Sequence, residues 1–152
     1  MSKRKKPEFI SPPPETPKTK HQFAPGKIGY HDKKPIFAFT YYFDDNKKWS
    51  FCCVKESSNF HVLFRNLYHM SQLTWSAILK AKHQFHAHEV EDFSRLALCV
   101  RNHFNGQNIR ELPPFQFKAF DEKSRIIGVF TNNAVFEIIC IDLNHATYTS
   151  RH

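Results

Sequence analysis

The stretch of sequence that decides the fold is RIIGVFTNNAVFEIICIDLNH, residues 125–145. Residues 125–130 and 134–141 are rich in Ile, Val and Phe, and the polar run Thr131-Asn132-Asn133 lies between them. Aromatic and β-branched runs on either side of turn-forming residues are typical of a β-hairpin. The stretch therefore predicts two antiparallel strands, with polar residues where the second strand ends.

Alternation along the second strand assigns its side chains to the two faces of the sheet. One face is expected to carry Val135, Glu137, Ile139 and Ile141, and the other Phe136, Ile138, Cys140 and Asp142. Asp142 marks the exit from the sheet, because an ionised carboxylate is costly to bury without a partner. In an antiparallel hairpin the start of one strand lies beside the end of the next, so Arg125 is expected close to Asp142.

The rest of the folded body mixes strand and helix patterns. We expect a β-hairpin of 36–43 and 49–54, followed by a helix over 57–70 capped by Ser57-Ser58-Asn59 and a short helix capped by Thr74. A polar His-rich loop is expected over 80–91, a helix over 93–104 and a strand over 115–120. The segment 93–104 also fits the alternation of a strand. Together these elements predict a single α+β domain, a mostly antiparallel sheet with two or three helices packed on one face.

Residues 1–34 differ in composition from the rest of the chain. They include KRKK at 3–6 and PPP at 12–14, and they hold nine Lys or Arg against three Asp or Glu. This segment therefore carries six of the eight net positive charges. We interpret 1–34 as a flexible basic arm and 35–152 as the folded domain. The arm would be either an electrostatic tether to nucleic acid or an acidic partner, or a solubilising tail.

Composition excludes several classes of protein. No run approaches the ~18 apolar residues of a transmembrane helix, and no apolar segment follows the basic N-terminus as in a secretory signal. We therefore expect a cytoplasmic protein with no membrane partner and no cofactor. The cysteines show no spacing typical of a zinc site, and we interpret them as small buried residues in a reducing compartment. They are Cys52, Cys53, Cys99 and Cys140.

The polar residues around the closing hairpin form the first candidate catalytic site, made of Arg125, Asp142, His145 and Tyr148. RNA cleavage by the ribose 2′-OH needs a general base, a cation at the phosphate and an acid for the leaving 5′-oxygen. His145 or Tyr148 could transfer the protons. Arg125, with Lys118 or Arg151, could hold the phosphate.

A structural role explains the same residues. Asp142 could pair with Arg125 or cap the turn that follows it, and His145 and Tyr148 could anchor the end of the chain. The sequence leaves both interpretations of Asp142 and its neighbours open.

A second cluster is KHQFHAHE, residues 82–89. His83, His86, His88 and Glu89 are metal-ligating residue types, but their spacing matches no recognised zinc motif. A solvated polar loop is the simpler interpretation, and we expect no metal. In an intermediate interpretation, Lys82 and His83 contact a phosphate.

The aromatic residues are numerous, with 16 Phe in 152 residues. Their spacing in strand and helix patterns predicts that they build the core. Tyr41, Tyr42 and Trp49 are the aromatic residues expected to be most suited to stacking on RNA bases.

The closing hairpin resembles the C-terminal hairpin of RelE/ParE-type toxins. The resemblance is carried by Arg125-Ile126-Ile127-Gly128, by Val135 to Asp142, and by His145 and Tyr148. In that family an Arg-led strand precedes an apolar strand that ends in a His or Arg and then a Tyr. With the middle segment from Leu73 to Glu89, the ending is also similar to small bacterial proteins that end in an Asp-x-Asn-His-x-x-Tyr motif.

This resemblance implies a toxin that cleaves mRNA and is covered by a cognate antitoxin. Arg125, His145 and Tyr148 would hold catalytic-type positions. Our first hypothesis is therefore a bacterial endoribonuclease of the toxin type, acting on RNA or the ribosome without a metal. The second is a non-enzymatic module that docks on nucleic acid or protein through its basic arm. A weaker third hypothesis is a metal-dependent nuclease that uses the cluster at 83–89.

Overall fold

The protein, described by a computed structural model over residues 32–44, 48–90, 93–131 and 135–146, is built on a five-stranded sheet. The strand order is β1-β5-β4-β3-β2. The strands are Ile36–Ala38 (β1), His88–Glu89 (β2), Pro114–Lys118 (β3), Arg125–Phe130 (β4) and Val135–Asp142 (β5). All neighbours are antiparallel except β1 and β5, which are parallel. The predicted α+β class and mostly antiparallel sheet are confirmed.

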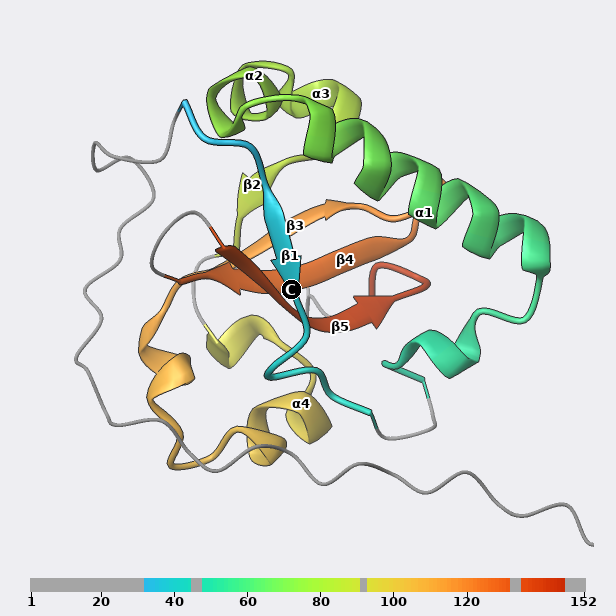
Figure 1. Ribbon diagram of the computed structural model, residues 1–152. Coiled ribbons are helices and arrows are strands. Elements are labelled where there is room, and N and C mark those ends of the chain that lie inside the picture. The colour runs from blue at the N-terminus through green and yellow to red at the C-terminus, as the bar shows by residue number, and fades with distance from the viewer. Residues whose placement is uncertain (1–31, 45–47, 91–92, 132–134, 147–152) are drawn as a thin grey trace, which may run out of the picture.

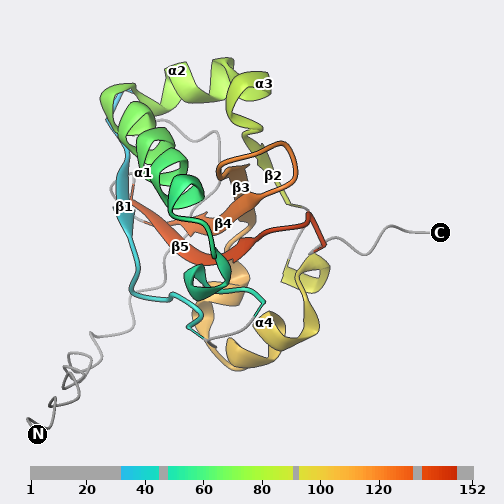
Figure 2. The same ribbon diagram turned by 90° about the vertical axis from the view of Figure 1, so that its right-hand side faces the viewer.

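Helices cover both faces of the sheet (Figures 1 and 2). Those described are α1 (Ser57–Gln72), α2 (Trp75–Lys80), α3 (Lys82–Phe85) and α4 (Leu98–His103), with 3₁₀ turns η1 (Phe51–Cys53), η2 (Phe93–Arg95) and η3 (Asn108–Glu111). The first three helices lie on one side of the sheet and α4 lies on the other. The expected packing of the helices on one face therefore holds for α1 and α2, whereas α4, within the helix expected over 93–104, covers the opposite face. Every residue of β4 is buried, because both of its faces are covered.

The predicted N-terminal hairpin is wrong. β1 pairs in parallel with β5, and residues 51–53 form the turn η1 instead of a second strand. The segment after β1 follows the outer edge of β5, where Phe43 N donates to Ile139 O at 2.7 Å and Ile141 N donates to Trp49 O at 3.0 Å. These long-range bonds satisfy the edge of β5, so a local hairpin is not needed to pair its backbone groups.

The pairing of β4 with β5 contains a β-bulge beside Gly128. One extra residue of β5, Ile139, is accommodated there, and it breaks the alternation of faces. Ile139 and Cys140 both pack on the α4 side of the sheet, whereas Ile141 packs with Ile138 on the α1 side. The prediction that Ile139 and Ile141 share a face is therefore wrong.

Gly128 is required by a close approach of two strands. A Cβ atom at this position would lie 2.2 Å from the Glu137 carbonyl oxygen and 2.6 Å from the Phe136 ring. Both distances are far below van der Waals contact, so the absence of a side chain lets the bulge form.

Aromatic rings fill the core between the sheet and α1–α2. Trp75, which is fully buried at the start of α2, stacks on Phe117 with ring centroids 5.8 Å apart and meets Phe130 edge-on at 4.7 Å. Phe136 packs against the same group, 5.0 Å from Phe117. The prediction that the Phe residues build the core is confirmed for these positions.

A second core lies on the opposite face. Side chains of β4 and β5 pack there against α4, η3 and the loops beside them. Its buried members include Val90, Leu96, Val100, Phe104, Ile109, Ile127, Val129 and Ile139. The two cores hold the sheet rigidly from both sides, which fixes the strand ends that carry the candidate site.

The helix starts were predicted in part. α1 begins at Ser57 as expected, but Glu56 occupies its N-cap position and no side chain caps it. Thr74 caps α2 as predicted, since its Oγ1 accepts a hydrogen bond from Ala77 N at 3.2 Å. Trp75 N donates to Lys33 O at 3.0 Å, so described structure begins before residue 35.

The remaining segments follow the sequence pattern less closely. The expected loop over 80–91 contains the short helix α3 and the two-residue strand β2. The expected helix over 93–104 consists of η2 and α4. The expected strand over 115–120 is β3, which begins and ends earlier, at Pro114 and Lys118.

Two predictions about side-chain exposure need correction. Cys140 is buried as expected, but Cys52 and Cys99 are exposed, and all four cysteines are free. Trp49 is only 6% exposed, and Tyr42 stacks on Phe51 with ring centroids 5.1 Å apart, so neither ring is available for RNA.

The length and composition of the described helices bear on whether one of them could cross a membrane. Among the described segments, none of the helices has both the length and the apolar character needed to cross a bilayer.

Candidate functional site

The ends of three neighbouring strands place charged residues in one row. Lys118 of β3 is the register partner of Arg125 of β4, and Arg125 is the partner of Asp142 of β5. Directly opposed residues of antiparallel strands have Cβ atoms roughly 4.5–5.5 Å apart. The predicted proximity of Arg125 to Asp142 is therefore confirmed.

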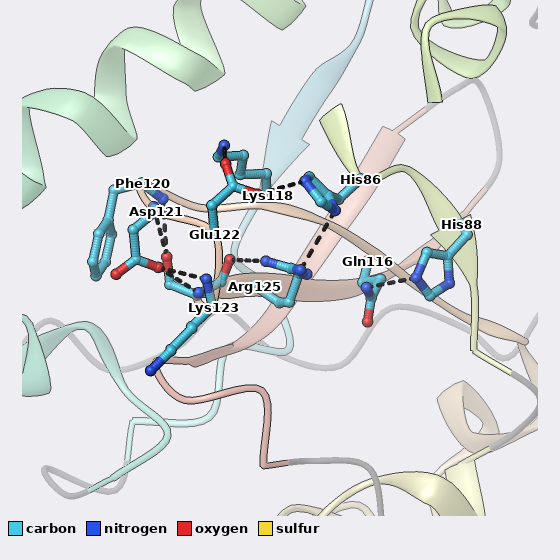
Figure 3. Close-up of polar contacts among 10 residues, drawn as sticks. His86, His88, Gln116, Lys118, Phe120, Asp121, Glu122, Lys123 and Arg125 are labelled. Atoms are coloured by element: carbon cyan, nitrogen blue, oxygen red, sulfur yellow. Dashed lines mark hydrogen bonds and ion pairs between the residues drawn. The ribbon is translucent and has the colours of Figure 1, made fainter. Parts of the chain in front are cut away.

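Two residues further along the same face lies a second polar group. Gln116 of β3 pairs in register with His88 of β2, at the edge of the sheet. In Figure 3 the Arg125 side chain points toward His86, and the Gln116 side chain points toward His88. The strand register thus brings together residues that lie far apart in the sequence.

Arg125 is a buried cation with few partners. Its side chain belongs to a residue that is 5% exposed, and its Nη1 donates to the Ser124 carbonyl oxygen at 2.9 Å. Nη2 lies 3.5 Å from His86 Nδ1, while Nε is buried without a hydrogen-bond partner among the described residues. A buried donor with no partner is costly, and such groups in native proteins commonly serve a ligand or an ordered water.

The turn between β3 and β4 holds Arg125 in place. Asp121 Oδ1 accepts from Ser124 N at 2.6 Å and from Lys123 N at 2.9 Å, and Ser124 Oγ accepts from Phe120 N at 3.1 Å. Burial acts to raise the pKa of Asp121, but these hydrogen bonds outweigh it, so that this pKa is lowered. The ionised Asp121 therefore stabilises the turn from which Arg125 projects.

Asp142 organises the loop that follows β5. It is fully buried, and its Oδ1 accepts from Asn144 N at 3.1 Å and from Ala146 N at 3.0 Å. These bonds close a tight turn in which His145 has a φ of 54°. The capping role that the sequence left open for Asp142 is confirmed, and it makes Asp142 a positioning residue for His145.

His145 has the electrostatic environment of a proton acceptor. Much of its side chain is exposed, yet partial burial lowers the pKa of His145, and the positive charge of Arg125 lowers it further. The Asp142 carboxylate acts in the opposite direction, and His88 and His86 also lower this pKa. The neutral ring is therefore favoured near neutral pH, which is the form a general base needs.

His86 links Arg125 to two charged residues of β3 and its turn. Because a guanidinium only donates hydrogen bonds, His86 Nδ1 accepts from Arg125, and Nε2 carries the proton toward Glu122 Oε2 at 3.1 Å. The other Glu122 oxygen contacts the Lys118 ammonium. His86 itself has a φ of 47°.

His88 is held by Gln116. The Gln116 amide nitrogen lies 2.8 Å from His88 Nε2, and His88 Nδ1 lies 3.1 Å from the Glu89 carbonyl oxygen. In this arrangement the amide donates to a neutral ring that is protonated at Nδ1. The Gln116 amide oxygen is buried without a hydrogen-bond partner among the described residues. Rotation of the amide by half a turn would place this oxygen next to His88 Nε2, where it could accept a hydrogen bond from a protonated ring.

Backbone strain marks the same place. Among the residues that the structure describes, the non-glycine residues with positive φ are His86 and His145. This conformation costs about 1–2 kcal/mol for a residue with a side chain. Strain of this kind collects at functional sites, where the surrounding structure imposes it.

The other predicted site residues are not part of this group in the described structure. Lys82 and His83 are exposed on α3. Tyr148 and Arg151 lie outside the described residues. His86, His88 and Gln116 were not predicted as parts of this site. The signal that could have found them is the alternation of His86 and His88 beside an edge strand.

The His-rich cluster at 82–89 is not arranged as a metal site. Over the described ranges, no group of three or more His, Cys, Asp or Glu side chains is placed to hold a metal ion. His86 and His88 instead contact Arg125 and Gln116, respectively.

Comparison with known proteins adds no family. No family model matches the chain, and neither the curated proteins nor the solved structures contain a significant match. The resemblance of residues 125–148 to RelE/ParE-type toxins therefore stays a prediction.

Proposed function

We propose that the protein is a metal-independent endoribonuclease of the toxin type, whose active site is the group formed by Arg125, His145, His86 and His88. The observation that carries the proposal is a buried, incompletely paired guanidinium that contacts His86 and lowers the pKa of His145, a ring on which the imidazoles of His86 and His88 also act. Two of these imidazoles sit on strained backbone. Such a site offers a base, an acid and a fixed positive charge without further groups.

The reaction that fits is attack of a ribose 2′-oxygen on the adjacent phosphorus. His145, neutral near pH 7, accepts the 2′-OH proton as the P–O2′ bond forms. His88, in its protonated form and with its Nε2 released from Gln116, gives the Nε2 proton to the 5′-oxygen as the P–O5′ bond breaks, and Tyr148 is the second candidate for this role. Arg125 stabilises the charge that develops on the phosphate oxygens. The products are a 2′,3′-cyclic phosphate and a free 5′-hydroxyl.

The toxin role rests on the resemblance of the closing hairpin, and the bacterial, cytoplasmic setting comes with it. RNA or the ribosome would be the target, and a cognate antitoxin would cover the site. An RNA-cleaving enzyme of this kind slows growth when it is produced without its antitoxin.

Induced expression tests this role directly. Wild type, His145→Ala and Tyr148→Phe are compared for growth and for RNA integrity in the same host. We expect wild type to arrest growth and degrade RNA, and His145→Ala to do neither at equal protein levels. Normal growth with intact RNA after induction of the wild type would refute the toxin role.

The alternative is a non-enzymatic interaction module that binds nucleic acid or an acidic protein through residues 1–34. The favouring observation is that six of the eight net positive charges lie in this segment. Binding of this kind is mainly electrostatic and weakens steeply with salt. Deletion of residues 1–34 with retained folding would abolish RNA affinity in this case, whereas an active site at Arg125 would retain cleavage.

A further inference from the structure

A pocket of about 370 Å³ lies between α1 and α3, with Lys118 of β3 in its lining. Three amide side chains line it, from Asn66, Gln72 and Gln84, together with His69, Phe85 and Lys118. The volume falls at the lower end of the range of about 300–1,000 Å³ that is usual for small-molecule sites. It is suited to a group about the size of one nucleotide.

The lining matches the chemistry of a nucleobase. Amide side chains can donate and accept at the same time, as the edge of a base requires, and an aromatic ring provides a surface for stacking. Asn66 Nδ2 donates to the Ala119 carbonyl oxygen at 2.7 Å, which fixes this side chain and reserves its oxygen for a ligand. Phe85 supplies the ring and Lys118 the cation.

The surrounding layer is free of acidic residues in the sequence. Residues 57–88 contain no Asp or Glu, but they hold Arg65, Lys80, Lys82 and five His. A surface of this composition attracts nucleic acid and acidic proteins alike, so its charge alone does not distinguish between these two ligands. The amide-rich pocket favours RNA.

Two exposed aromatic rings lie on α1, the helix that contributes Asn66, His69 and Gln72 to the pocket lining. Phe64 and Tyr68 of α1 are 62% and 61% exposed, and they lie one helical turn apart. The Tyr68 ring is 5.7 Å from the ring of His69, which lines the pocket. Rings on an exposed surface are stacking platforms for unpaired bases, and each such stack contributes to affinity without demanding a particular base.

A chain of side-chain contacts links the pocket to the candidate active site. Lys118 lines the pocket and contacts Glu122, whose other oxygen lies 3.1 Å from His86. His86 in turn contacts Arg125. Gln84 and Phe85 directly precede His86 in the chain, so one short segment contributes to both places.

We propose that this pocket binds one nucleotide of a single-stranded RNA, next to the phosphodiester that Arg125 and His145 act on. The position relative to the scissile bond rests on the proposed function, but binding of the nucleotide does not. Gln72 and Gln84 hydrogen-bond the edge of the base, Phe85 stacks on it, and Lys118 contacts its phosphate.

The test is binding of an RNA that cannot be cleaved, a fluorescent hexanucleotide with 2′-O-methyl riboses. Its dissociation constant is measured by anisotropy at one fixed salt concentration for the full-length wild type and for the double variant Gln72→Ala/Gln84→Ala. Both residues are exposed, so the variant retains its fold. We expect its affinity to fall about tenfold, the size expected for one bidentate amide–base pair. Gln107→Ala, an exposed glutamine beyond α4, is the matched control and should leave affinity unchanged.

A second set of oligonucleotides locates the base. A single abasic nucleotide is moved through the six positions. At one position the loss of the base should weaken binding by the wild type more than binding by the double variant, because the variant already lacks the amide contacts and loses only the stack on Phe85. Equal affinity of wild type and double variant for the intact RNA would overturn the inference, and so would a wild type that binds no oligonucleotide. The effect of His145→Ala on cleavage judges the proposed function separately.

Discussion

Replacement of Asp142 separates its structural role from a catalytic one. Its Oδ1 accepts two backbone hydrogen bonds, from Asn144 and Ala146. A hydrogen bond to a charged group contributes about 1.5–3 kcal/mol. Because Asn144 and Ala146 are exposed and water replaces part of the loss, we expect Asp142→Ala to lower the free energy of unfolding by about 3 kcal/mol. Asp142→Asn keeps an acceptor oxygen and should cost only about 1 kcal/mol.

Urea unfolding followed by circular dichroism measures both effects. With a slope of about 2 kcal/mol per molar urea, the midpoint should shift by about 1.5 M for Asp142→Ala and by about 0.5 M for Asp142→Asn. Equal midpoint shifts for the two variants would refute the reasoning, because they would show that the accepting oxygen contributes nothing beyond the charge. Since Asp142 positions His145 and transfers no proton, Asp142→Asn should also retain RNA cleavage.

Three further predictions follow from individual contacts. The pKa of His145 is lowered on folding, so protonation favours the unfolded state and stability falls as the pH drops below about 6.5. Arg125→Met should raise the pKa of His145, as measured by NMR titration of its ring. An unchanged pKa in this variant would contradict the role given to Arg125. Gly128→Ala should lower the free energy of unfolding, measured with urea, by at least about 2 kcal/mol, because the new Cβ overlaps the backbone of Glu137. Gly106→Ala has open space around its Cβ but a positive φ, so it should lower the same quantity by only about 1 kcal/mol. Similar losses for both variants would be inconsistent with the close approach at Gly128. Burial raises the pKa of Glu137 against the opposing effect of its hydrogen bonds, so ionisation of Glu137 lowers stability as the pH rises above about 4.5. The melting temperature should therefore fall between about pH 4.5 and 7, and Glu137→Gln should remove this fall. An equal fall in the variant would show that Glu137 is not its cause.

Local patterns predicted the parts of the fold that depend on local interactions. β4 and β5 are long, apolar and joined by a turn, so their pairing is evident from residues 125–142. α1 and α2 have helical spacing, and Thr74 caps α2 as its position predicts. The α+β class follows from these elements alone.

The errors occur where distant residues decide the structure. β1 has three residues, and its partner β5 lies about a hundred positions away, so local alternation gave no sign of parallel pairing. The bulge at Gly128 depends on the ring of Phe136, which no periodicity reveals. Trp49 reads as an aromatic strand residue, but packing against the second core buries it.

The candidate site was half predicted for the same reason. Arg125, Asp142 and His145 belong to one hairpin, so their proximity follows from its register. His88 belongs to β2, a two-residue strand whose pairing with β3 depends on the whole sheet, and His86 lies just before it at the end of α3. A sequence pattern shows that these histidines exist, but only the strand order β4-β3-β2 shows what they face.

The measurement that tests the central claim most directly is cleavage of a defined RNA by the purified protein in the presence of EDTA. The account predicts fragments that end in a 2′,3′-cyclic phosphate and begin with a 5′-hydroxyl, no cleavage of DNA of the same sequence, and loss of cleavage in His145→Ala. Uncleaved RNA with the wild type, or equal cleavage by wild type and His145→Ala, would contradict it.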